Sequence, residues 1–142
     1  MEMTGEQLIP LPQQTVWEGL NDPAVLKDCI TGCNALDRVS DSEFRIAITV
    51  AVGPVKAKFS GKLALMDIVP PTSYSLAFEG SGGAAGFGKG TAQVSLAAEG
   101  AGTRLSYVAK ANVGGKLAQI GSRLIDGVAM KLADDFFTKF KQ

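Results

Sequence analysis

The chain has 142 residues, of which 46% are hydrophobic and 20% charged, and its 14 basic residues balance its 14 acidic ones. This composition predicts a single globular domain over residues 1–142, large enough to bury a hydrophobic core. Nucleic-acid-binding proteins normally carry an excess of positive charge, so we expect no nucleic-acid partner.

The sequence contains no histidine, which removes the commonest general base and the commonest metal ligand. Cys29 and Cys33 stand four residues apart, with no other thiol or imidazole to complete a zinc site, so we expect no metal. Two interpretations of this pair stay open: reduced, partly buried thiols, or a redox-active pair. No apolar run approaches the ~20 residues of a transmembrane helix, and the N-terminus lacks a signal-peptide pattern, so we expect a cytoplasmic protein.

The N-terminal part of the chain predicts one strand and two short helices. Residues 2–9 form the expected strand, which ends at Pro10. A helix over 12–20 begins at a proline, whose missing N–H costs nothing in the first turn. A second helix follows Asn21-Asp22-Pro23 and ends at Gly32.

From Cys33 onward the hydrophobic period changes to two, which is typical of strands with one dry face. Glycine and proline at 53–54, 70–71, 80–83 and 99–102 separate the alternating runs. The short connections predict antiparallel pairing, and with the first strand the sheet has about seven strands.

The segment from Val113 to Phe140 predicts one long amphipathic helix. At ~100° per residue its apolar stripe consists of Leu117, Ile120, Gly121, Leu124, Val128 and Leu132. No other predicted element is long enough to cover the sheet, so we expect an α+β fold in which a curved antiparallel sheet wraps around this helix. A glycine in the stripe lowers the stability of a helix by about 1 kcal/mol relative to alanine. Its presence there indicates that something close to this face of the helix needs the space.

Small residues from several elements lie on the predicted inner face of the sheet. If Val94 points inward, alternation places Gly88 and Gly90 on the same face. They permit close packing with glycine-driven sheet curvature, or an apolar cavity between sheet and helix. We favour the cavity because the small residues lie on more than one element. The predicted ligand-binding residues that line it are Phe59, Gly61, Phe78, Gly88, Gly90, Tyr107, Ala109, Leu117, Gly121, Leu124 and Val128.

Two further motifs do not predict catalysis. Gly83 to Lys89 matches a phosphate-binding P-loop except at its last position, but the chain continues as a strand where a P-loop needs a helix. The carboxylates are dispersed and form no pair suited to acid–base chemistry, so we assign no catalytic residue.

The end of the predicted helix carries Phe136, Phe137 and Phe140, which depart from the apolar stripe by ~100° or more. Lysines lie among them. Two interpretations stay open: contact with another protein or a membrane surface, or packing against the two short helices.

Five segments together carry a resemblance to a known family: residues 53–61, Pro70-Pro71 with Tyr74, residues 82–90, Gly102-Thr103, and residues 113–125. They resemble the CoxG-like family of carbon monoxide dehydrogenase operons, which belongs to the START/SRPBCC helix-grip superfamily. Thr31 stands where the family usually has a proline before Gly32-Cys33. Many members continue into a C-terminal membrane-targeting segment, which the residues up to Gln142 do not include.

The resemblance implies a non-catalytic accessory protein of a carbon monoxide dehydrogenase or other molybdenum hydroxylase. It implies no covalent cofactor, a lipophilic ligand such as a quinone between sheet and helix, and recruitment of the enzyme to the inner face of the cell membrane. One alternative is a cyclase- or hydrolase-like enzyme of the same superfamily, which would need a polar residue such as Asp135 or Tyr107 deep in the pocket. Another is a docking module with a filled core.

Overall fold

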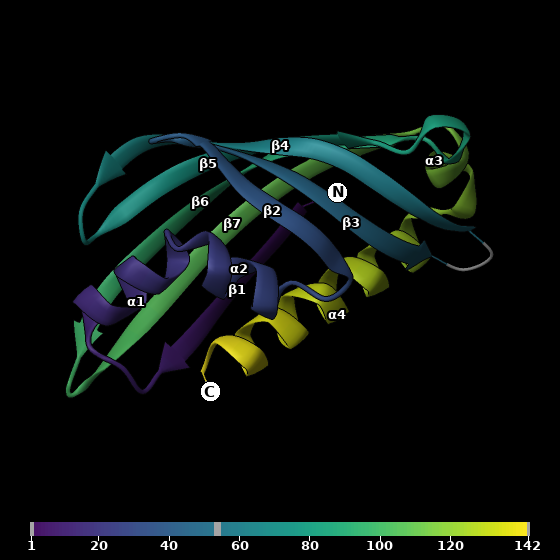
Figure 1. Cartoon of the computed structure of the whole chain (residues 1–142). Helices are drawn as coiled ribbons and strands as arrows, with labels where there is room; N and C mark the ends of the chain where they lie inside the picture. The colour runs from purple at the N-terminus through teal and green to yellow at the C-terminus, as the bar shows by residue number, and fades with distance from the viewer. Residues whose placement is uncertain (1, 53–54, 142) are drawn as a thin grey trace.

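The computed structural model describes residues 2–52 and 55–141, which form a seven-stranded antiparallel sheet with the helices on one of its faces (Figure 1). The strand order is β1-β7-β6-β5-β4-β3-β2. The strands are β1 (Glu2–Ile9), β2 (Cys33–Ser40), β3 (Glu43–Val52), β4 (Val55–Val69), β5 (Ser73–Ser81), β6 (Phe87–Glu99) and β7 (Gly102–Gly114). The helices are α1 (Gln13–Leu20), α2 (Pro23–Cys29), α3 (Lys116–Ile120) and α4 (Ser122–Phe140), with one 3-10 turn, η1 (Gly83–Ala85). The predicted α+β architecture is confirmed.

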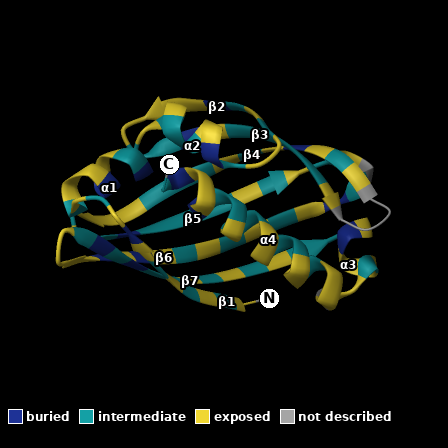
Figure 2. Ribbon diagram, turned by 90° about the horizontal axis from the view of Figure 1, so that it is seen from below, coloured by how far each residue is buried: buried dark blue, intermediate teal, exposed yellow. Residues whose placement is uncertain are grey.

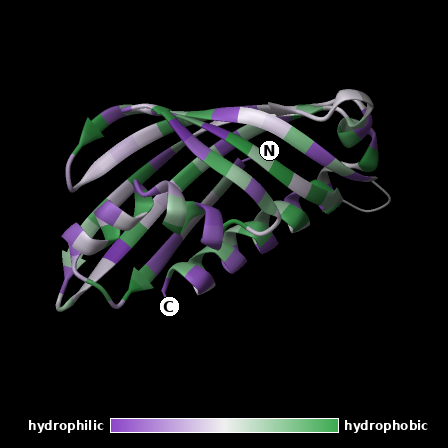
Figure 3. Ribbon diagram, viewed as in Figure 1, coloured by the Kyte–Doolittle hydropathy of each residue, from purple (hydrophilic) through white to green (hydrophobic). Residues whose placement is uncertain are grey.

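The register of the sheet follows the alternation of the sequence. Leu96 of β6 pairs with Leu105 of β7, and both are buried on the face that carries the helices. Their neighbours Ser95 and Ala97 are exposed on the opposite face. Alternation of this kind gives each strand one buried side and one solvent-exposed side. The burial colours of Figure 2 and the hydropathy colours of Figure 3 change along the strands in the same way.

Helices α1 and α2 close one end of the sheet. The side chain of Asp22 caps α2 by accepting a hydrogen bond from the Ala24 N–H at 2.9 Å. The ring of Trp17 in α1 meets the ring of Tyr74 in β5 edge-on, with centroids 5.5 Å apart. Thr103, fully buried, donates from Oγ1 to the carbonyl of Leu11 at 2.7 Å and so ties the start of β7 to the chain leading into α1.

The C-terminal segment is not one helix, so the prediction of a continuous helix from Val113 is wrong. Strand β7 continues to Gly114, and the helical part is divided at Gly121, whose φ of 106° and ψ of 144° are far from helical values. Helix α3 is therefore a separate turn, and only α4 runs along the sheet (Figure 2). The P-loop-like segment forms η1 and continues into β6, as expected.

The phenylalanine-rich end of α4 is part of the core. Phe137 and Phe140 are 8% and 6% exposed, and Phe136 packs between them in edge-on and stacked contacts with centroids 5.2 Å and 5.8 Å apart. The Phe140 ring lies against Gly19 of α1. This placement confirms the packing interpretation for Phe137 and Phe140, whereas Phe136 is half-buried.

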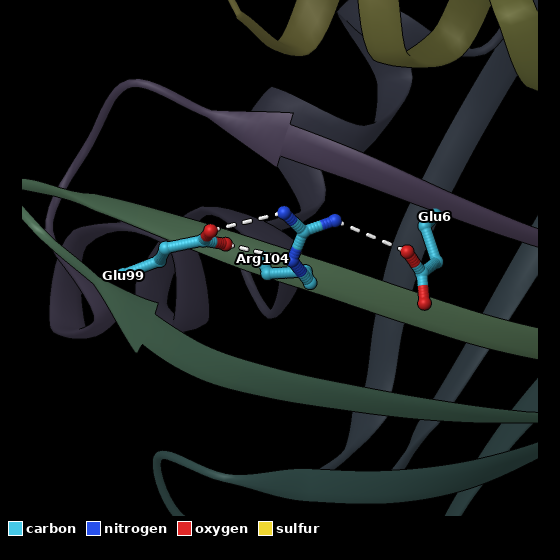
Figure 4. A network of polar contacts seen from close by, with 3 residues as sticks. All are labelled: Glu6, Glu99 and Arg104. Carbon is cyan, nitrogen blue, oxygen red and sulfur yellow. Dashed lines mark hydrogen bonds and ion pairs between the residues drawn. The ribbon is translucent and has the colours of Figure 1, made fainter.

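An exposed ion-pair network lies on β1, β6 and β7. The Arg104 guanidinium contacts Glu99 at 2.7 Å and Glu6 at 3.1 Å (Figure 4). The hydrogen bonds from Arg104 lower the pKa of Glu99 below its usual value. Because all three side chains are exposed, the network contributes little stability, but it links edge strand β1 to the β6–β7 hairpin.

Candidate functional site

The helices and the sheet meet in two separate packed regions with a gap between them. The larger region joins α1, α2 and the end of α4 to β1 and β5–β7. The smaller one surrounds Phe59 of β4 and Leu117 of α3, both 9% exposed. Between the two, side chains of the inner face such as Leu63 and Leu76 remain only half-buried. The middle of α4 therefore does not pack closely on the sheet.

The gap contains a chamber of about 570 Å³ that is partly open to solvent. This volume lies within the range of about 300–1,000 Å³ that is usual for small-molecule sites. Its walls are almost wholly apolar and come from the strands, α3 and α4. They include Met3, Ile30, Ile46, Ile48, Val50, Phe59, Leu63, Leu76, Phe78, Gly80, Gly88, Ala109, Ala111, Val113, Leu117, Ile125, Val128, Ala129, Leu132, Ala133 and Phe136.

A second chamber of about 280 Å³ adjoins the first and reaches towards α1 and α2. It contacts Leu20, Leu26, Phe44, Leu65, Tyr74, Ala92, Val94, Leu105, Tyr107 and Phe137. Six residues border both chambers: Met3, Ile30, Leu63, Leu76, Ala133 and Phe136. The two spaces therefore lie next to each other along α4, with Ala133 and Phe136 where they adjoin, and together we call them the channel.

The structure brings together seven of the eleven predicted site residues. Phe59, Phe78, Gly88, Ala109, Leu117 and Val128 border the larger chamber, and Tyr107 borders the smaller one. Their role in binding stays a prediction.

Four predicted residues lie outside both chambers: Gly61, Gly90, Gly121 and Leu124. Leu124 is 49% exposed on α4. A Cβ at Gly90 would overlap the carbonyl oxygen of Lys110 and lie 2.7 Å from Cζ of Phe78. Gly90 therefore permits close approach of neighbouring groups, as the packing interpretation stated, and leaves no space for a ligand.

Gly121 faces open space, so its role is conformational. A Cβ there would meet no described atom within 4 Å, but its φ of 106° is one that other residues adopt only with strain. We expect Gly121→Ala to lower the free energy of unfolding by about 1–3 kcal/mol. Gly127→Ala is the matched control, because Gly127 lies inside α4 with equally open surroundings and no positive φ. Alanine at this position should raise the free energy of unfolding by about 0.5–1 kcal/mol. Urea unfolding of both variants measures the two changes. Equal changes in the free energy of unfolding would contradict the conformational role of Gly121.

Sequence reasoning missed several wall residues, notably Ala133, Tyr74 and Leu63. The signal was available for the strands, because Leu63 alternates inward with Phe59 and Tyr74 alternates inward with Phe78. Small residues alone are incomplete markers of space in this fold. Large apolar side chains that simply lack a packing partner form most of the walls instead.

The polar chemistry of the channel is sparse. Asp135, a candidate for the enzyme alternative, pairs with Lys131 at 3.0 Å on α4 and borders neither chamber. Burial raises the pKa of the Cys29 and Cys33 thiols, and both cysteines are free, which favours unreactive reduced thiols. Within residues 2–52 and 55–141 there is no group of three or more acidic or cysteine side chains placed to hold a metal ion.

Tyr74 is the most deeply buried polar side chain of the channel, and burial raises its pKa from 10.0 to about 12. The folded protein therefore holds this proton more tightly than the unfolded chain, and stability should fall as the pH rises from about 10 to about 12. At about 1.36 kcal/mol per pKa unit, the expected loss is about 2–3 kcal/mol. Urea unfolding below and above this pH window measures it. Tyr74→Phe should lose correspondingly less stability over the same pH range. If the stability of this variant fell with pH as much as that of the wild type, the assignment to Tyr74 would be contradicted.

A hollow of about 520 Å³ lies on the opposite face of the sheet, behind Gly80 and Gly88. Charged side chains surround it, among them Lys62 and Glu79, which form an exposed ion pair at 3.7 Å. Only the peptide backbone separates this hollow from the larger apolar chamber, because Gly80 and Gly88 border both spaces. Lys62, Glu79 and Lys89 contact both spaces as well, but they are solvent-exposed residues and give the channel no buried charge.

No helix among the described residues is both long and apolar enough to cross a membrane.

Comparison with solved structures supports the helix-grip architecture. A conserved protein from Geobacillus kaustophilus shares 33% identity, with 99% of this chain and 93% of that chain covered and a TM-score of 0.92. Ara h 8.0201 (13% identity, coverage 99% and 95%, TM-score 0.68) and the Zhui aromatase/cyclase from Streptomyces sp. R1128 (10% identity, coverage 99% and 91%, TM-score 0.67) share the fold. A comparison with curated proteins found no match.

The sequence matches the carbon monoxide dehydrogenase CoxG family over residues 5–142, nearly its whole length. With the sheet, the C-terminal helix and the early short helices all in the expected places, this chain belongs to the CoxG family and has the START/SRPBCC helix-grip fold.

Proposed function

We propose that this protein is a non-catalytic accessory protein of a carbon monoxide dehydrogenase-type molybdenum hydroxylase, and that it carries a lipophilic molecule such as a quinone in the channel between sheet and α4. The observation that supports this most is the apolar channel itself. Its two chambers have volumes of about 570 and 280 Å³. A docking module with a filled core would not need such a space, since interiors normally pack at about 0.74 density.

Burial of an apolar ligand supplies the driving force for such a carrier. Each Å² of apolar surface removed from water contributes about 25 cal/mol, and here the ligand would cover half-buried wall residues at the same time. Exchange with a membrane or an enzyme needs an accessible opening, and the larger chamber is partly open to solvent. Both features favour reversible carriage.

The enzyme alternative has weaker support. Tyr74, with its pKa raised to about 12, stays protonated at neutral pH and is no general base there. The charged residues that contact the larger chamber are Lys62, Glu79 and Lys89, all exposed to solvent. The described channel walls therefore offer no buried, ionised acid–base pair.

A role in bringing the enzyme to the membrane is a second candidate. Met66, Ile68 and Val69 at the end of β4 are 41%, 42% and 55% exposed. Exposed apolar residues grouped on one hairpin are typical of contact surfaces. Flotation with vesicles of the host's lipids tests this role. Co-flotation that Ile68→Glu abolishes would support it, and failure of the wild-type protein to float would reject it.

Native mass spectrometry of the protein purified from its own host tests the carrier proposal. We expect an adduct whose mass, after extraction, belongs to a lipophilic molecule. Incubation should return that molecule chemically unchanged, whereas an enzyme would convert it. A protein that carries no adduct and binds no added decylubiquinone would overturn the proposal.

A further inference from the structure

Tyr74 is a deeply buried polar side chain at the border of the narrow chamber. Tyr74 lies on the inner face of β5, is 7% exposed, and borders the 280 Å³ chamber. Trp17 packs edge-on against its ring at 5.5 Å and holds it in place. The side chain is therefore fixed in an apolar environment near the end of the channel that α1 and α2 cover.

The Tyr74 hydroxyl has no hydrogen-bond partner among residues 2–52 and 55–141. Every fully enclosed side-chain nitrogen or oxygen in that part of the chain does have a partner. The Tyr74 oxygen therefore keeps some accessible surface, and the space that its side chain borders is the narrow chamber. A hydroxyl that loses its water without gaining a hydrogen-bond partner is destabilised by about 1–3 kcal/mol, so a ligand that fills the chamber and displaces water from this oxygen should offer it an acceptor.

Tyr107, the other tyrosine of the chamber, is placed differently. It lies two strands away on the same face, since Val94 pairs with both tyrosines across the sheet. The Tyr107 ring stacks on Phe137 with centroids 5.7 Å apart, and its hydroxyl lies over Gly5 near the sheet edge. Tyr107 is also less buried than Tyr74. The two tyrosines therefore place their hydroxyls in different surroundings, and only Tyr74 is deeply buried.

We propose that the hydroxyl of Tyr74 donates a hydrogen bond to an oxygen acceptor of the bound molecule, so that the ligand is an amphiphile whose carbonyl or ether end lies in the narrow chamber. The apolar remainder then extends past Ala133 into the larger chamber. This inference rests on the proposed carrier function and specifies the class of ligand and its direction. Because burial raises the pKa of Tyr74, the hydroxyl keeps its proton and acts as a donor at any physiological pH.

A pair of chain-matched probes tests the inference: the methyl ketone tridecanone, which has an acceptor at one end, and tridecane, which has none. Binding is measured by displacement of a fluorescent dye from the ligand-free protein. We expect the wild type to prefer the ketone. Tyr74→Phe should weaken ketone binding by about tenfold, the effect of one buried hydrogen bond, and leave alkane binding unchanged. Ser95→Ala, which removes a hydroxyl on the opposite, exposed face of β6, should leave both affinities within about twofold.

The outcomes separate this inference from the carrier proposal. If both probes bind and Tyr74→Phe does not change the ketone-to-alkane ratio, the hydrogen bond is rejected and the carrier proposal stands. If neither probe binds the wild type, the hydrogen bond is rejected, and the carrier proposal falls as well if the protein carries no adduct and does not bind decylubiquinone. Should Tyr74→Phe not fold, the carbonyl stretching frequency of tridecanone bound to the wild type decides. A shift to lower frequency relative to alkane solvent supports the hydrogen bond, and an unshifted band overturns it.

Ligand-free stability gives an independent check. A hydroxyl without a protein partner contributes no hydrogen bond to folding, so Tyr74→Phe without ligand should unfold at the same temperature as the wild type or higher at neutral pH. A clearly lower unfolding temperature would show that the hydroxyl already has a partner in the protein, which contradicts the inference.

Discussion

Ala133→Phe is expected to weaken binding of decylubiquinone by at least about tenfold, equivalent to about 1.4 kcal/mol. Ala133 lies on α4 where the two chambers meet, and it borders both. A phenyl ring at this position would reduce the space of both chambers where they adjoin. Fluorescence titration of wild type and variant under the same conditions measures the loss.

Ala118→Phe is the matched control for this prediction. Ala118 lies on α3, is exposed, and borders neither chamber, so the same substitution should leave binding within about twofold. The fold of Ala133→Phe should survive, because the new ring enters an existing space and is not forced into a packed core. A folded Ala133→Phe protein that binds as tightly as the wild type would show that the ligand does not lie in this channel.

The sheet was predictable because the alternation of apolar and polar residues along each strand indicates which side of the strand is buried. Alternation in β6 placed Val94 correctly on the buried inner face, and the turn residues between strands predicted antiparallel neighbours. The same local rule predicts which side chains face the helix side. It does not predict which of them the helix touches, because that depends on how far α4 stands from the sheet.

The division of the C-terminal helix was missed because a helical wheel assumes continuous helical dihedral angles. Gly121 was interpreted as a small residue inside an apolar stripe, whereas its positive φ separates α3 from α4. A glycine is also the commonest residue just beyond a helix end. Together with Gly114-Gly115, it indicated a short helix bounded by glycines, and that pattern could have been recognised.

Small residues on the inner face proved to have two different roles. Gly88 borders the larger chamber, whereas Gly90, two residues later in the same strand, permits close approach of Phe78 and the backbone of β7. Sequence alone does not separate these roles, because both depend on the local curvature of the sheet. The hydroxyl of Tyr74 was likewise unpredictable: its inward direction follows from alternation, but its lack of a partner follows from the surroundings of the folded chain.

Phe140→Ala is expected to lower the free energy of unfolding by about 3–5 kcal/mol, the usual range for removing a buried phenylalanine side chain. Phe140 is 6% exposed, stacks on Phe136, and lies against Gly19 of α1. Its loss leaves a cavity between α1 and the end of α4, where Lys141 also donates to Gln7 of β1 at 2.8 Å. Urea unfolding with wild type and variant at the same pH measures the change.

Met130→Ala is the control on the same helix, because Met130 is 57% exposed and should change stability by less than about 0.5 kcal/mol. If Phe140→Ala instead kept full stability and lost only membrane or partner binding, the end of α4 would be a contact surface and its packing against α1 would be incidental. The buried position of Phe140 predicts instead that the substitution lowers stability first and affects binding only as a consequence. Because this packing holds one end of α4, its loss should loosen the helix and weaken ligand binding even though Phe140 borders neither chamber.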